Sequence, residues 1–215
     1  MPADYPDPRQ PQILDPFAGT VIPAAPLEPE ADSFSPRLFR GYHNVALLLR
    51  DGRLLTGGGV NKHGPVGCEH NNLRLLYPPY LRTGVQRPEV RAPGGGALGA
   101  QPLRLALGGV LEIEFVGGPL RTGGAFTASL LSFGSFTHSF GMGQTLVPLR
   151  TLLIVASGAT SGRLTLGVEL SATAAVPGDY LLFIIGESGA PSEGVHLQLR
   201  SPDVSGGGDG DGDGG

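Results

Sequence analysis

Short apolar runs separated by turn residues dominate the second half of the chain. In residues 111–115, Leu, Ile and Phe alternate with two glutamates, so an extended strand here would bury one face and expose the other. Seven apolar runs follow residue 101, with Gly or Pro at most junctions: PLRLALG, VLEIEFVG, AFTASLLSFG, QTLVPL, RLTLGVELSA, YLLFIIGE and GVHLQLRS. No stretch keeps a helical period. The pattern predicts an all-β sandwich over residues 102–201.

The first half of the chain predicts smaller sheets. ILDPFAGTVIP, within the proline-rich start, has the pattern of a strand, a turn and a second strand. In VALLLRDGRLLTGGG two apolar runs flank Asp51-Gly52, which favours a hairpin with a type I′ turn. LRLLYPPYL predicts a strand ended by Pro78 and Pro79, and residues 83–102 contain too much Pro and Gly for any regular element.

These patterns divide the chain into four parts. Residues 1–85 form an incomplete β region, residues 86–101 a linker, residues 102–201 the sandwich and residues 202–215 a Gly/Asp tail that we expect to be disordered.

Composition and charge narrow the functional classes only slightly. The formal net charge of −4 comes from 19 acidic and 15 basic residues without a basic cluster, so we expect neither a nucleic-acid partner nor binding to an anionic membrane. The runs TLLIVA and YLLFIIG are too short to span a bilayer, and MPADYPDPRQ has no apolar core for a signal peptide. Cys68 is the only cysteine, which rules out an intrachain disulfide. Nothing predicts the oligomeric state.

Tyr42, His43 and His138 form the sharpest candidate site. Neighbouring strand residues point to opposite faces, so Tyr42 and His43 share a site only if the chain is kinked, which Gly41 permits. His138 lies in SFGSFTHSFGMG, which predicts a flexible glycine-rich loop at the rim of the sandwich. Two imidazoles and a phenolate suit copper(II). On spacing alone, the simpler interpretation is a packed tyrosine and two ordinary surface histidines.

Three weaker candidates have simpler explanations. Cys68 and His70, with Glu69 between them, would be half of a metal site without its second half, so a solvated loop is preferred. The tail DGDGDGG imitates the start of a calcium loop but lacks the later glutamate and the flanking helices. His196 lies mid-strand in GVHLQLR, where it is predicted to face solvent, and the sequence identifies no partner for it.

Several phrases together resemble the galactose oxidase and glyoxal oxidase family of copper-radical oxidases. RGYHNVALLLRDGRLLTGGG, NNLRLLYPPYL and Arg87-Pro88 are similar to the end of that family's seven-bladed propeller. GSFTHSF and VPGDYLLFIIGESGAPSEGVHLQL are similar to its immunoglobulin-like, early-set C-terminal domain. The resemblance therefore implies an early-set β-sandwich preceded by a propeller remnant.

The resemblance also implies a copper centre. His43 and His138 would be the equatorial imidazole ligands, and Tyr42 the axial phenolate that takes the proton of the substrate alcohol. The family's radical-bearing tyrosine, its cross-linked cysteine and its stacking tryptophan have no counterpart in this chain, which contains no tryptophan. An acidic-Gln-Arg phrase that usually follows the THS-type loop is Gly143-Gln144-Thr145 here, which removes an anchoring ion pair.

Two functions follow as expectations. The first is the C-terminal portion of an oxidase that oxidises primary alcohols or aldehydes with dioxygen to give hydrogen peroxide, inactive as this isolated chain. By resemblance, its substrate is a carbohydrate or a small alcohol or aldehyde, and its location is extracellular. The alternative is a non-catalytic binding or structural module, or a truncated gene product.

Overall fold

The computed structural model describes residues 12–15, 20–23, 42–60, 73–82, 84, 86–120, 127–138, 140–168 and 175–202. Strands make up nearly all of their regular structure, and the one helix among them, α1 (Pro79–Arg82), is a single turn. The prediction of an all-β chain is confirmed. None of the described helical structure is long and apolar enough to cross a membrane. The candidate site at Cys68 and His70 and the acidic tail lie outside the described residues.

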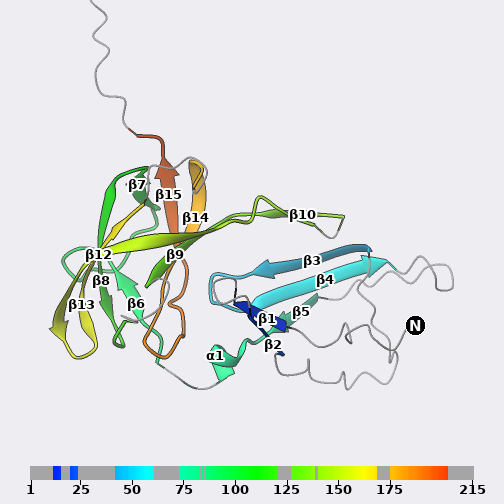
Figure 1. Ribbon diagram of the computed structural model, residues 1–215, viewed down its shortest axis with the longest axis horizontal. Helices are drawn as coiled ribbons and strands as arrows, with labels where there is room; N and C mark the ends of the chain where they lie inside the picture. Colours follow the sequence, from blue (N-terminus) through cyan, green and yellow to red (C-terminus); the bar gives the residue numbers. More distant parts are fainter. Residues whose placement is uncertain are drawn as a thin grey trace, which may run out of the picture.

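The second half of the chain folds into one eight-stranded sheet that closes over itself (Figure 1). The strands follow the order β6 (Glu89–Arg91), β8 (Val110–Val116), β13 (Ser161–Gly167), β12 (Leu146–Gly158), β9 (Ala128–Ser132), β14 (Gly178–Ile184), β15 (Val195–Arg200) and β7 (Leu103–Ala106). The long strand β12 belongs to both layers, because residues 146–149 pair with β9 and residues 150–158 with β13. A strand that passes from one layer to the other is a standard way of making a sandwich corner.

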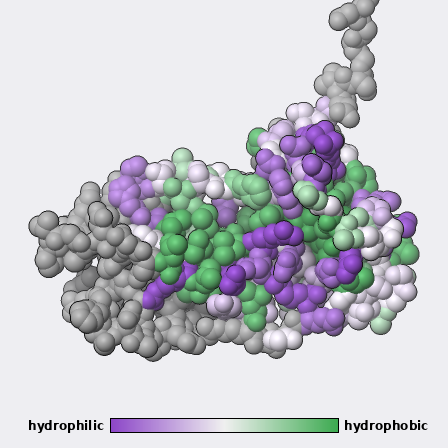
Figure 2. Space-filling view, turned by 180° about the vertical axis from the view of Figure 1, so that it is seen from behind, coloured by the Kyte–Doolittle hydropathy of each residue, from purple (hydrophilic) through white to green (hydrophobic). Residues whose placement is uncertain are grey.

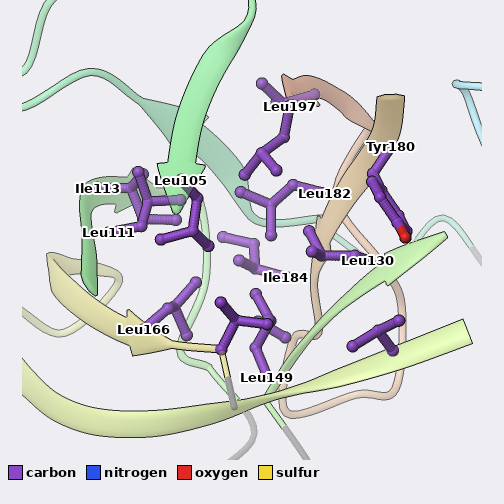
Figure 3. Packing of buried hydrophobic residues seen from close by; sticks show 14 of the residues in the cluster. Leu105, Leu111, Ile113, Leu130, Leu149, Leu166, Tyr180, Leu182, Ile184 and Leu197 are labelled. Carbon is purple, nitrogen blue, oxygen red and sulfur yellow. The ribbon is translucent and has the colours of Figure 1, made fainter. Parts of the chain in front are cut away.

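Apolar side chains from both layers meet in the interior of this sandwich (Figure 3). Leu111, Ile113 and Phe115 of β8 are at most 8% exposed, whereas Glu112 is exposed, so the predicted alternation is confirmed. From the other layer, Leu182 and Leu197 are 0% exposed. The hydroxyl of buried Tyr180 donates to the carbonyl oxygen of Val176 at 2.6 Å and so ties the start of β14 to the preceding turn, as in a tyrosine corner.

The seven predicted runs all contain strands, but the prediction of a linker without regular structure is wrong at β6. Residues 89–91 pair with residues 114–116 of β8 and extend the eight-stranded sheet. Next to β6, the backbone N–H of Gly94 donates to the Glu114 carboxylate at 3.1 Å. The proline and glycine residues of this stretch therefore led to a wrong prediction, because a short strand at the edge of a sheet tolerates both residue types nearby.

Two smaller sheets precede the sandwich. β1 (Gln12–Asp15) and β2 (Thr20–Pro23) form a two-stranded pair, and β3 (Tyr42–Leu48), β4 (Leu54–Val60) and β5 (Leu73–Leu76) form a three-stranded sheet. The strands expected on either side of Asp51-Gly52 are present.

The prediction of a type I′ turn between β3 and β4 is wrong. Among the described residues only His43 and His138 combine a side chain with positive φ, so Asp51 lacks the positive φ that this turn requires. Gly52 has φ +89°, its N–H donates to the Leu49 carbonyl at 2.9 Å, and the Leu49 N–H donates to the Arg53 carbonyl at 2.8 Å. These bonds define a three-residue loop that ends in a left-handed glycine.

The glycine-rich segment predicted as a flexible loop is instead a second hairpin. β10 (Ser135–Thr137) and β11 (Phe140–Met142) pair in antiparallel register, with Thr137 opposite Phe140. The hairpin leaves the sandwich and runs along β3 toward the start of that strand (Figure 1). Gly141 lets the strands close, because a Cβ at this position would lie 3.2 Å from the Phe136 ring.

Candidate metal centre

His43 lies where the pairing of β3 and β4 is interrupted. Tyr42 pairs with Val60 and Asn44 with Gly58, while His43 has φ +60°, a conformation that is uncommon for any residue with a side chain. Because this conformation breaks the strand alternation, Tyr42 and His43 are not forced onto opposite faces. The expected kink is therefore present, but the structure shows it at His43 itself, while Gly41 lies outside the described residues.

The glycines of β4 make room for this irregularity. Gly58 and Gly59 both have positive φ, and a Cβ on Gly58 would lie only 2.6 Å from the carbonyl oxygen of His43. A side chain at position 58 would thus collide with backbone that cannot move independently. This role of Gly58 was not predicted, although the run TGGGV opposite YHN was a visible signal of close backbone approach.

His138 lies at the tip of the β10–β11 hairpin. Residues 138 and 139 connect the paired residues Thr137 and Phe140, and two-residue hairpin loops need positive φ at their first position. His138 meets this requirement with φ +52°. Both candidate histidines therefore occupy left-handed positions, which usually carry Gly, Asn or Asp. Such conformations cluster at functional sites, where the surrounding structure enforces them.

The structure brings the two histidine rings together although they come from different sheets. Their centroids lie 5.0 Å apart with an angle of 48° between the ring planes. Both residues are exposed, so the pair opens to solvent. Two imidazoles bound to one metal ion through nitrogens at about 2 Å have centroids roughly 4.5–6 Å apart, depending on the angle at the metal. The observed spacing fits two ligands of one ion.

Thr137 orients the ring of His138. The Thr137 hydroxyl oxygen and His138 Nδ1 are 2.7 Å apart, in a hydrogen bond whose direction depends on the imidazole tautomer. When Nδ1 carries the proton and donates, the acceptor lone pair of the neutral ring is on Nε2. Metal-binding histidines commonly use this arrangement, because a bond at one nitrogen fixes the ring for the other.

Ser132 anchors the base of the hairpin that carries His138. Its hydroxyl donates to the Gly143 carbonyl at 2.5 Å and accepts from the Thr145 N–H at 2.6 Å, and its own N–H donates to the Thr145 carbonyl at 3.0 Å. The loss of an acidic-Gln-Arg anchor at residues 143–145 was visible in the sequence, but this substitute for it was not. A serine at a strand end gives no sequence signal of such a role.

Other predicted site features stand apart from this pair. The backbone of Tyr42 pairs within β3, but its side chain is not among those described, so its role as a ligand stays a prediction. Within the described residues, no three His, Cys, Asp or Glu side chains gather around a common point. His196 faces solvent as expected, and the structure gives it a partner that the sequence did not reveal: its Nε2 lies 2.8 Å from the Asp179 carboxylate.

A comparison with family models assigns the sandwich. Residues 97–199 match the model described as "Galactose oxidase-like, Early set domain". This part of the chain is a galactose oxidase-like early-set domain. The prediction of a galactose oxidase-type sandwich is thereby confirmed.

Curated relatives extend the similarity beyond the early-set domain. Two galactose oxidases of Gibberella zeae are 29% and 28% identical over 171 residues, which are 76% of this chain and 22% of each relative. A WSC domain-containing protein of Arthroderma benhamiae is 26% identical over 176 residues, 80% of this chain and 17% of the relative. The chain thus spans about a fifth of the length of these relatives.

A solved structure shares the fold. It is described as a novel fungal alcohol oxidase of the AA5 family in complex with copper, with a TM-score of 0.58 and 23% identity. The match covers 89% of this chain and 36% of that one. The similarity therefore includes residues before the early-set domain as well as the sandwich.

Proposed function

We propose that this chain is the C-terminal part of a copper-radical oxidase in which His43, His138 and the phenolate of Tyr42 bind copper(II). The observation that carries the proposal is the 5.0 Å separation of the two histidine rings. Nothing in the local sequence of β3 or of the β10–β11 hairpin requires them to meet. The similarity to galactose oxidases and the left-handed backbone of both histidines support the same assignment.

Each residue of the site has a distinct task in this proposal. His43 and His138 supply imidazole nitrogens, and Thr137 fixes the orientation of the His138 ring. Tyr42 supplies a phenolate oxygen that takes the proton of the substrate hydroxyl. A copper ion held there supplies one-electron redox chemistry, and the family stores the second oxidising equivalent on a cross-linked tyrosine that this chain does not contain.

The overall reaction converts RCH₂OH and O₂ into RCHO and H₂O₂. The alcohol loses two electrons and two protons, and dioxygen accepts both. Primary alcohols, including carbohydrates, are the proposed substrates, because the relatives are named galactose oxidase and alcohol oxidase. Aldehydes are proposed on the resemblance to glyoxal oxidases alone. We propose an extracellular location on the same resemblance. Metal binding by this chain and its similarity to glyoxal oxidases are likewise proposals.

Copper titration followed by electron paramagnetic resonance tests the metal site. We expect copper(II) to bind the wild-type chain with nitrogen hyperfine structure. His43→Ala and His138→Ala should each weaken binding at least about tenfold, because each removes one of two nitrogen ligands. His196→Ala is the matched control, since this exposed histidine bonds to Asp179 instead. Spectra and affinities unaffected by the first two substitutions would place the copper elsewhere and reject the proposal.

A peroxidase-coupled assay tests whether this chain alone can oxidise a substrate. We expect the copper-loaded 215-residue chain to produce no substrate-dependent peroxide from primary alcohols, aldehydes or galactose-like sugars, because its tyrosines and Cys68 do not match the family's radical pair. Background peroxide with a reductant present would be independent of substrate. Substrate-dependent peroxide that disappears in Tyr42→Phe would show that the chain is a complete oxidase.

A further inference from the structure

The sandwich contacts the three-stranded sheet at both ends of β3. At the start of β3, the β10–β11 hairpin lies alongside the strand (Figure 1). The rings of His138 and His43 are 5.0 Å apart there. At the other end, the turn over residues 49–53 meets the sandwich loop before β15. There the backbone N–H of Gly194 donates to the carbonyl oxygen of Arg50 at 2.7 Å. A shallow depression lined by Leu49, Arg50, Asp51 and Glu193 marks this second contact, away from the histidines.

One side chain, Arg87, makes most of the polar bonds at the second contact. Its Nε donates to the Pro191 carbonyl at 2.6 Å, and its Nη2 donates to the Ser192 carbonyl at 2.8 Å. Its Nη1 donates to the Asp51 carbonyl at 2.7 Å. The guanidinium therefore bonds to the sandwich on one side and to the β3–β4 turn on the other. A planar fork fixes the relative directions of all three bonds, which a lysine ammonium does not.

The groups that accept these bonds are themselves held in place. Ser192 is 0% exposed, and its N–H and hydroxyl bond to the backbone of Ile184 in β14 at 2.8 and 3.1 Å. On the other side, the Tyr80 hydroxyl donates to the Gly52 carbonyl at 2.7 Å. Burial raises the pKa of Tyr80, so this hydroxyl stays a neutral donor at physiological pH. Arg87 thus bonds to two segments that other hydrogen bonds hold in place, Ser192 against β14 and Gly52 against Tyr80.

The contact at Arg87 is a joint between the sandwich and the β3–β4 turn, and the length of β3 separates it from His43. A small rotation at this joint is therefore a large displacement at His43. The strand rises about 3.3 Å per residue, so the Asp51 carbonyl lies on the order of 20 Å from His43. A rotation of about 5° at the joint would then move the far end by roughly 1.7 Å, enough to disturb a metal site. We propose that Arg87 is a positioning residue: by fixing the sandwich against the β3–β4 turn, it holds His138 opposite His43.

A distance measurement between the two parts tests the joint without any metal. Spin labels would be placed at Ala46→Cys in β3 and Glu112→Cys in β8, both exposed, in a Cys68→Ser background. Pulsed electron resonance should give one narrow distance distribution for the otherwise wild-type chain. Arg87→Met should broaden it markedly, and Arg87→Lys should broaden it to a lesser degree. Arg163→Met is the matched control, because Arg163 is an exposed sandwich arginine beside Glu114.

Either Arg87 variant can overturn the proposal. A distribution as narrow as wild type in Arg87→Met would do so directly. Circular dichroism identifies variants that keep the sandwich folded, and Arg87→Lys retains the charge and an aliphatic stem if Arg87→Met does not fold. A wild-type distribution in Arg87→Lys, which lacks the fork, would contradict the proposal as well.

The link to the histidine pair rests on the proposed copper site and needs its own measurement. We expect Arg87→Met to weaken copper(II) binding about fivefold or more, with the nitrogen hyperfine structure of the bound ion unchanged. A broadened distance with wild-type copper affinity would show that the joint does not position the histidines. If His43→Ala and His138→Ala leave copper binding unchanged, the proposed function fails, and the distance result still decides the role of Arg87.

Discussion

The sandwich and the three-stranded sheet contain similar apolar strands, but only the sandwich buries them. Every buried hydrophobic residue of the described core lies between Val90 and Leu199. In the three-stranded sheet, Leu55 is half-buried, while Leu73 and Leu75 are 68% and 42% exposed. Figure 2 shows apolar residues gathered over this part of the molecule. The difference is therefore in coverage of the strands and not in their composition.

The register of the three-stranded sheet shows why coverage matters. Leu55 of β4 is paired with Leu47 and Leu75, and its neighbour Leu54 with Leu48 and Leu76. Since adjacent residues point to opposite faces, this sheet carries leucines on both. In the sandwich, strand β8 carries Leu111 and Ile113 on the face that the other layer covers and Glu112 on the opposite face. A sheet with two apolar faces needs two covering layers to reach comparable stability.

Hydrogen exchange should show the largest difference between the two regions. We expect backbone amides in β8, β13, β14 and β15 to exchange at least about 100-fold more slowly than those in β3 and β4, because opening the sandwich exposes its whole core. Mass spectrometry of the exchanged, proteolysed chain would compare residues 43–56 with residues 110–116 and 180–184. Equal or greater protection in residues 43–56 would contradict the comparison.

Matched leucine truncations sharpen the same comparison. Leu182→Ala removes a side chain that is 0% exposed and leaves a cavity in the sandwich, so the free energy of unfolding should fall by about 3–4 kcal/mol. Leu75→Ala makes the same chemical change at a residue that is 42% exposed, and should cost less than about 0.5 kcal/mol. Urea denaturation of both variants measures the difference. Similar losses would mean that Leu75 is covered in solution.

The sequence predicted the sandwich well because its signals are local. Alternation in β8 and turn residues between the strands reflect rules that act over a few positions. The predictions went wrong where longer-range context decides the outcome. β6 forms in a Pro- and Gly-rich stretch because the edge of β8 is available to it, and the β3–β4 turn has three residues instead of two. A dipeptide alone does not determine the length of the loop that contains it.

The two histidines of the candidate site could be proposed from the sequence, but the interactions that hold them in place could not. His43 and His138 were singled out by residue type and then by resemblance, and the structure brings their rings together, while their role as ligands stays a prediction. The interactions around them involve residues distant in sequence, such as Gly58 beside the His43 carbonyl and Ser132 beneath the His138 hairpin. Arg87 was noted only as part of a family phrase. Its three carbonyl acceptors are backbone groups, which no pattern of side chains reveals.

A substitution at Ser132 tests whether the His138 hairpin depends on the sandwich. Ser132→Ala removes the hydroxyl that bonds to Gly143 and Thr145, and should destabilise the base of the hairpin by about 1 kcal/mol. We expect faster exchange at Thr145 and weaker copper binding, with the melting temperature of the sandwich nearly unchanged. Ser129→Ala is a contrasting control, because Ser129 is buried in the same strand away from the hairpin base. Unchanged exchange at Thr145 would show that the hairpin is held by other contacts.

The smallest expected effect concerns the acid sensitivity of the β3–β4 turn. A hydrogen bond from Arg53 holds the pKa of Asp51 below its ordinary value, so the ionised carboxylate favours the folded turn. A carboxyl group with a lowered pKa stabilises above its ordinary pKa, and this contribution is lost as the pH falls through the folded value. The loss should be slight, since the side chains of Arg53 and Asp51 are 31% and 34% exposed and solvent screens the pair.

Asp51→Asn measures this contribution directly. We expect a small decrease in the protection of the Gly52 amide at pH 7, corrected for intrinsic exchange, and a difference from wild type that shrinks as the pH falls through the lowered pKa of Asp51. Glu112→Gln, an exposed carboxylate in β8 of the sandwich, should leave the turn unchanged at every pH. A difference that persisted undiminished at low pH would mean that Asp51 supports the turn through its shape rather than its charge. In that case the turn, like the sandwich, would owe its stability to contacts that pH does not alter.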